Sequence, residues 1–167
     1  MKLTLHLRRC LCAVCLPLFV VACGGGDPRA LTDAGAAALN GGDAPKAQAQ
    51  FEAALTAIGA DTKHPQYLEA SIGRVQALAR IDAPRAVREF LNLAKSGAAL
   101  SDNDFSLVAW ELMRANAMKD AVDLMHEGQK LYPGSKTMVQ LKEQVIAETN
   151  RKGDSGALKQ LQGLGYL

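Results

Sequence analysis

From Ala30 onward, apolar residues recur every three to four positions, a spacing typical of α-helices and not of strands. The same stretch is rich in Ala, Leu, Gln and Lys and contains few runs of β-branched residues. This pattern predicts an all-α domain over residues 30–152.

A five-residue motif divides this domain into repeats. Asp-Ala-Pro-Lys-Ala at 43–47 returns 39 residues later as Asp-Ala-Pro-Arg-Ala at 82–86. The aspartate can cap the amides of a first helical turn, and proline is tolerated there because it loses no intrahelical hydrogen bond. Each motif therefore predicts a helix start. Further helices are expected ahead of them, over Leu31–Gly42 and Gln66–Ile81, so that each motif lies in a helical hairpin.

A third hairpin is predicted over Asp102–Pro133. Asn116 can adopt the left-handed conformation at its turn, and the carboxylates of Asp102 and Asp104 fit a helix start better than an acid-base site. The expected apolar face consists of Phe105, Val108, Ala109, Leu112, Ala121, Met125 and Leu131.

The segment Ser135–Lys152 follows the third hairpin. It is expected to form a capping helix of the kind that a stack of helix pairs needs at its end. Its apolar face consists of Met138, Leu141, Val145 and Ile146.

Small residues in these hairpins resemble the pattern of the tetratricopeptide repeat (TPR) family. The first copy carries Gly35, Ala38, Gly42, Ala47, Phe51, Ala54 and Leu55, and the third carries Ala109, Leu112, Ala121, Met125, Gly128 and Pro133. The second keeps Gly73, Ala86 and Phe90, but it needs one extra residue and has Leu93 where a small residue is expected.

The resemblance implies a right-handed α-solenoid of about three TPR-like hairpins plus the capping helix. It also places Ala47, Ala54 and Ala121 at close helix crossings. A plain helical bundle is the alternative.

The first 22 residues read as an export signal. Basic residues precede a twelve-residue apolar run, too short for a transmembrane helix, and Val20-Val21-Ala22-Cys23 resembles the lipobox of bacterial lipoproteins. We expect cleavage before Cys23, lipidation of its thiol, and a short linker at 23–29. In enterobacterial lipoproteins, an aspartate directly after the lipidated cysteine marks retention in the inner membrane. Gly24 stands at that position here, so the resemblance favours the outer membrane, facing the periplasm. The alternative is an ordinary secretory signal with a chance cysteine.

Removal of the signal changes the formal net charge from +2 to −1, so the sequence gives no reason to expect nucleic acid as a partner. The other three cysteines leave with the signal, which leaves no thiol for a disulfide or a metal site. His64 and His126 lack a metal-binding spacing and are expected to be exposed. No enzyme motif is present, so we expect neither catalysis, a cofactor nor a metal.

The tail at 153–167 carries leucines interspersed with glycines, and Gly163 and Gly165 argue against a long helix there. Its leucines are expected to fold back on the last hairpin. An exposed docking peptide is the alternative.

The resemblance to TPR proteins and to bacterial lipoproteins implies a membrane-anchored scaffold that binds a protein or peptide partner, as TPR lipoproteins do in envelope assembly, pilus or secretion machinery. The alternative is a ligand-binding or enzyme-modulating lipoprotein of cell-wall or polysaccharide metabolism. In TPR domains, first-helix positions off the core face line a concave groove, although Trp110 can instead pack against the neighbouring repeat. The predicted groove residues are Asn40, Tyr67, Arg74, Ser106, Trp110, Met113 and Arg114.

Overall fold

The computed structural model describes residues 26–167, which form eight α-helices and no strand. The predicted signal peptide (1–22) and Cys23 lie outside the described residues. The helices are α1 (Pro28–Asn40), α2 (Ala44–Ile58), α3 (Tyr67–Ile81), α4 (Ala83–Lys95), α5 (Asp102–Arg114), α6 (Met118–Leu131), α7 (Lys136–Lys152) and α8 (Ser155–Gly163). The all-α prediction is confirmed for this part of the chain, in which no helix is both long and apolar enough to span a bilayer.

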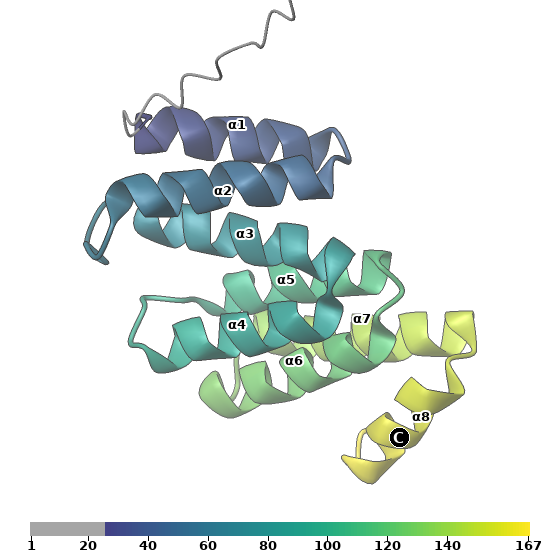
Figure 1. The fold of residues 1–167 in the computed structure, drawn as a ribbon. Helices are drawn as coiled ribbons and strands as arrows, with labels where there is room; N and C mark the ends of the chain where they lie inside the picture. Colours follow the sequence, from purple (N-terminus) through teal and green to yellow (C-terminus); the bar gives the residue numbers. More distant parts are fainter. Residues whose placement is uncertain (1–25) are drawn as a thin grey trace, which may run out of the picture.

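The helices pack in chain order, from α1 at one end to α8 at the other (Figure 1). Helices α1 and α2, α3 and α4, and α5 and α6 contact each other as hairpins. Contacts between α1 and α3, α3 and α5, and α5 and α7 join the first helices of successive hairpins to α7. We call the surface formed by α1, α3, α5 and α7 the first-helix face. On the other side, α4 and α6 lie next to each other.

Helix starts follow the predicted chemistry. The carboxylates of Asp43 and Asp82 accept hydrogen bonds from backbone N–H groups three residues later, and proline occupies the first turn of both helices. At the start of α5, Ser101 and Asp104 form a reciprocal capping box. Asn116 has a φ of 61°, as predicted for the turn between α5 and α6. These local signals were readable because they depend on a few adjacent residues.

The first hairpin closes on α3 around Phe51. This ring is 2% exposed, and its edge faces the backbones of Gly35 on α1 and Gly73 on α3. A Cβ atom at either glycine would lie under 3 Å from the ring, so both positions require the absence of a side chain. The two glycines that matched the repeat pattern therefore let three helices approach one aromatic ring.

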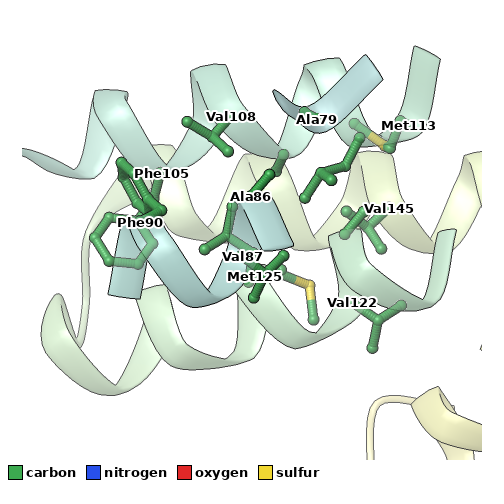
Figure 2. Packing of buried hydrophobic residues seen from close by; sticks show 14 of the residues in the cluster. Ala79, Ala86, Val87, Phe90, Phe105, Val108, Met113, Val122, Met125 and Val145 are labelled. Carbon is green, nitrogen blue, oxygen red and sulfur yellow. The ribbon is translucent and has the colours of Figure 1, made fainter. Parts of the chain in front are cut away.

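A larger core runs from α3 to α8, and Figure 2 shows part of it. Phe90 of α4 and Phe105 of α5 meet edge to face with ring centroids 4.8 Å apart. Tyr132 also packs edge to face on Phe105, with ring centroids 5.6 Å apart, and its hydroxyl donates a hydrogen bond to the carbonyl of Leu100. The three rings thus connect the second and third hairpins.

Ala47, Ala54 and Ala121 are fully buried, as expected for residues at close helix crossings. Leu93, which interrupts the pattern in the second copy, is only half-buried and lines a cleft between α2 and α4. The second hairpin thus departs from the first at the position where its sequence departs.

The C-terminal segments pack as expected, except that Leu167 at the end of the tail is 53% exposed. Helix α7 buries Met138, Leu141 and Val145, and the tail folds back as α8, which contacts α6 and α7 and buries Leu161. The tail is therefore not an exposed peptide over residues 155–163.

Several predicted details are wrong. Leu131 is 55% exposed because it is the last residue of α6 and points away from the core, whereas Met118, Val122 and Leu124 of the same helix are buried. Helix α1 begins at Pro28, capped by Asp27, so the linker cannot extend to residue 29.

Candidate partner-binding face

The seven predicted groove residues do not line one groove. Three pairs lie in three different depressions, and the seventh residue lines none of these. The pairs are Asn40 with Arg114, Tyr67 with Arg74, and Trp110 with Met113, and the remaining residue is Ser106, which is half-buried on α5.

A cavity of about 300 Å³ lies on the first-helix face between α1, α3 and α5. Arg80 of α3 forms part of its wall, donating from Nε to Glu111 Oε2 at 2.8 Å and from a terminal nitrogen to the Leu39 carbonyl at 2.8 Å. One guanidinium therefore ties the end of α1 to α3 and α5. Arg114 lies 3.6 Å from the other oxygen of Glu111 and remains largely exposed, so it offers a cation at the edge of the cavity.

Sequence reasoning missed Arg80, Glu111 and Leu107, which all line this cavity. Glu111 comes directly before Leu112 of the core stripe and is 7% exposed. Because a buried carboxylate needs a cationic partner, the position of Glu111 beside the stripe was the signal in the sequence for a nearby cation. The partner on α3, 31 positions away, could not be read from local spacing.

A second, shallow hollow of about 240 Å³ lies between α5 and α7. Trp110 forms one wall and Ala147 of α7 belongs to the opposite side. Met113 also lines the hollow but is only 2% exposed, and Figure 2 shows it among the buried core side chains, so the prediction that it projects away from the core is wrong. Met113 belongs to the core because α7 packs against α5 at this point.

Trp110 itself is 45% exposed, and so is Leu107 one helical turn before it. Leu107 lines the α1–α3–α5 cavity, while Trp110 lines the α5–α7 hollow. The two side chains therefore form an apolar ridge on α5 between two depressions of the first-helix face.

Cationic groups border the hollow. Glu148 Oε1 on α7 lies 2.5 Å from a terminal nitrogen of Arg151 and 3.4 Å from Lys152 Nζ. The hydrogen bond from Arg151 is the main cause that lowers the pKa of Glu148 to about 2. Lys152 also donates to the Met113 carbonyl and to Asn116 Oδ1, both at 2.7 Å. Two cations share one carboxylate, so the margin of the hollow is net positive.

The third depression is a cleft of about 450 Å³ between α2, α3 and α4. Arg74 reaches Glu89 of α4 at 2.7 Å inside this cleft. Tyr67 lies at the N-terminal end of α3, where the cleft meets a neighbouring cavity of about 540 Å³ that is lined by the loop residues 62–65 and 96–99. Since α2 and α4 form its sides, this cleft is separate from the first-helix face.

Neither histidine is as exposed as predicted. Both are half-buried: His64 Nδ1 accepts a hydrogen bond from the backbone of Gln66, and His126 Nδ1 lies 2.8 Å from the hydroxyl of Tyr166. The return of the tail onto α6 covers His126, which sequence spacing could not show. Among residues 26–167, no three potential ligands are grouped in a way that could hold a metal ion.

Comparison with family models, curated proteins and solved structures yields no match to this chain. Its function is therefore inferred from its residues and their geometry alone.

Proposed function

We propose that the chain is a lipid-anchored scaffold of TPR-like helical hairpins that binds a protein or peptide partner on its first-helix face. The partner would belong to envelope assembly, pilus or secretion machinery, and the scaffold would face the periplasm from the outer membrane. The observation that carries this proposal is the ridge of Leu107 and Trp110, two large apolar side chains that are each 45% exposed on one helix.

The solenoid interpretation is supported by the order of helix contacts. Each first helix contacts the next one, and the small residues Gly35, Gly73, Ala47 and Ala121 are buried where the repeat pattern expects close approach. Repeats of this kind present extended binding surfaces along one side of the stack.

The ridge suits a peptide because apolar and charged features alternate along the first-helix face. Trp110 offers aromatic contact area, and tryptophan is among the residues that contribute most to binding at protein interfaces. Arg114 and the Glu148–Arg151–Lys152 group add a net positive margin beside it. A partner segment with an apolar anchor and a nearby acidic group would complement this surface.

The proposed lipid anchor would hold the domain near the membrane. Four residues, 24–27, separate Cys23 from α1, and a glycine-rich segment of that length reaches roughly 10 to 12 Å on average. The α1 end of the stack would then lie within a short distance of the bilayer surface.

Photo-crosslinking in the producing cells tests this proposal. A photoreactive amino acid is placed at Leu107 or Trp110 in the full chain, and at the exposed Ala53 of α2 as a matched control. We expect the same envelope protein to be captured from positions 107 and 110 but not from 53. No capture from the ridge, or equal capture from position 53, would contradict partner binding on the first-helix face.

Fluorescence gives a second readout because Trp110 is the only tryptophan of the chain. In the free protein we expect Trp110 to be quenched readily by acrylamide, and to become protected when the captured partner is added. Emission that is blue-shifted and resists quenching before any partner is present would exclude Trp110 from the binding face.

A further inference from the structure

We propose that the cleft between α2, α3 and α4 is a second, independent binding site that takes a small carboxylate with an apolar body, of the size of an N-acylated amino acid. The site lies on the opposite edge of α3 from the first-helix face. It does not depend on the partner-binding proposal, and either can fail without the other.

The size and the composition of the cleft fit such a ligand. Its volume of about 450 Å³ falls within the range of small-molecule sites. Leu55, Val75 and Leu93 supply apolar surface from three different helices, and Tyr67 adds an aromatic ring at one end. Asn92 is exposed at the cleft margin and can hydrogen-bond an amide of the ligand. Polar and apolar groups line the cleft in nearly equal measure, which suits a ligand that has a charged end and an apolar body.

Arg74 is the cation that an anion in the cleft would meet. Arg74 and Glu89 line the cleft. Arg85 lies outside the cleft, and its Nε is 2.7 Å from Oε1 of Glu89. The adjoining cavity shares Tyr67 with the cleft and adds the exposed Lys63. The carboxylates of Glu52 and Asp82 also act on Arg85, so the group that would bind an anion in the cleft is Arg74 itself.

Arg74 already holds a carboxylate in this position, that of Glu89, at 2.7 Å. A ligand carboxylate that takes the place of Glu89 leaves Glu89 Oε1 paired with Arg85, and Glu89 Oε2 is buried and has no hydrogen-bond partner to lose, only its ion pair with Arg74. The Nε of Arg74 is buried and has no hydrogen-bond partner, so the guanidinium has one donor that Glu89 does not use. Guanidinium groups bind carboxylates through two parallel hydrogen bonds when geometry permits. Glu89 therefore acts as an internal competitor for the ligand.

This competition predicts opposite effects of two substitutions. Arg74→Gln removes the cation and should weaken binding of the carboxylate by about tenfold or more, as expected for loss of a charged hydrogen bond. Glu89→Gln removes the competing charge and should strengthen binding several-fold. Arg88→Gln is the matched control, because Arg88 is exposed on the same helix as Glu89 and does not line the cleft.

Saturation-transfer NMR on the full chain in detergent micelles measures these affinities with N-acetyl-leucine as the probe. N-acetyl-leucinamide, which lacks the charge, is the matched ligand, and empty micelles correct for partitioning. We expect saturation of N-acetyl-leucine by the wild type and by Arg88→Gln, a stronger response from Glu89→Gln, and little from Arg74→Gln. Circular dichroism establishes that each variant is folded.

The proposal is overturned if the amide binds as well as the acid, or if Glu89→Gln binds the acid no better than the wild type. The Glu89→Gln arm decides the question even if Arg74→Gln does not fold. Neither result would affect the photo-crosslinking at Leu107 and Trp110.

Discussion

Gly73→Ala offers a direct test of how the first hairpin joins the second. An added Cβ at this position would lie 2.5 Å from Cε1 and 2.8 Å from Cε2 of Phe51. Carbon atoms in contact are normally about 3.5 to 4.0 Å apart, so the overlap is roughly 1 Å. The ring cannot withdraw easily, because its edge also faces Gly35 on α1 and it is almost completely buried.

Two effects of opposite sign decide how much Gly73→Ala changes the free energy of unfolding. Overpacking a filled core costs roughly 1 to 3 kcal/mol. Replacing a glycine inside a helix by alanine contributes roughly 1 kcal/mol of helix propensity in the other direction. Because Phe51 is held from both sides, we expect the cost to lie in the upper part of its range and the net free energy of unfolding to fall by about 1 to 2 kcal/mol.

The Phe51→Leu background separates the two effects. Leucine leaves room beside Gly73, so Gly73→Ala should there raise the free energy of unfolding by up to about 1 kcal/mol, since only the propensity gain remains. Urea denaturation followed by circular dichroism measures all four variants. Gly163→Ala in α8 is the control, because no atom lies within 4 Å of its added Cβ. A neutral or stabilising Gly73→Ala in the wild type, or a destabilising one in Phe51→Leu, would refute the packing described around Phe51.

Substitutions at Cys23, Ala121 and Glu148 test the anchor, the repeat register and one ion-pair group. Cys23→Ala should abolish acyl labelling and leave the precursor uncleaved, so labelling that persists would end the lipoprotein interpretation. Ala121→Leu should lower the free energy of unfolding by about 1 to 3 kcal/mol because Ala121 is fully buried; an unchanged urea midpoint would show that the repeat register is wrong. Hydrogen bonding from Arg151 lowers the pKa of Glu148 to about 2, so the stabilising contribution of Glu148 is present above its unfolded pKa and is lost as the pH falls towards 2. The urea midpoint of the wild type should therefore exceed that of Glu148→Gln at pH 5, and the two should converge at pH 2; a gap that stays constant with pH would show that Glu148 contributes no charge-dependent stability.

The sequence was most informative where structure depends on neighbouring residues. The caps at Asp43 and Asp82, the left-handed Asn116 and the core stripe around Phe105 were all predicted and are present. Each depends on the helical period or on a bond spanning three residues. Leu131 shows where prediction from the helical period fails. The apolar spacing continues to Leu131, the last residue of α6, but no neighbouring helix covers this side chain.

The candidate site was less predictable because its residues were chosen by position within a repeat. That rule assumes equal packing of every hairpin, and the second hairpin is the irregular one: Leu93 replaces a small residue and lines the cleft between α2 and α4. Arg74 consequently lies in that cleft and pairs with Glu89. Arg80, nearly two turns further along α3, instead faces α1 and α5. One helix thus contributes an arginine to each of two separate surfaces, and which surface each one reaches depends on contacts with α4 and α5 that no local pattern encodes.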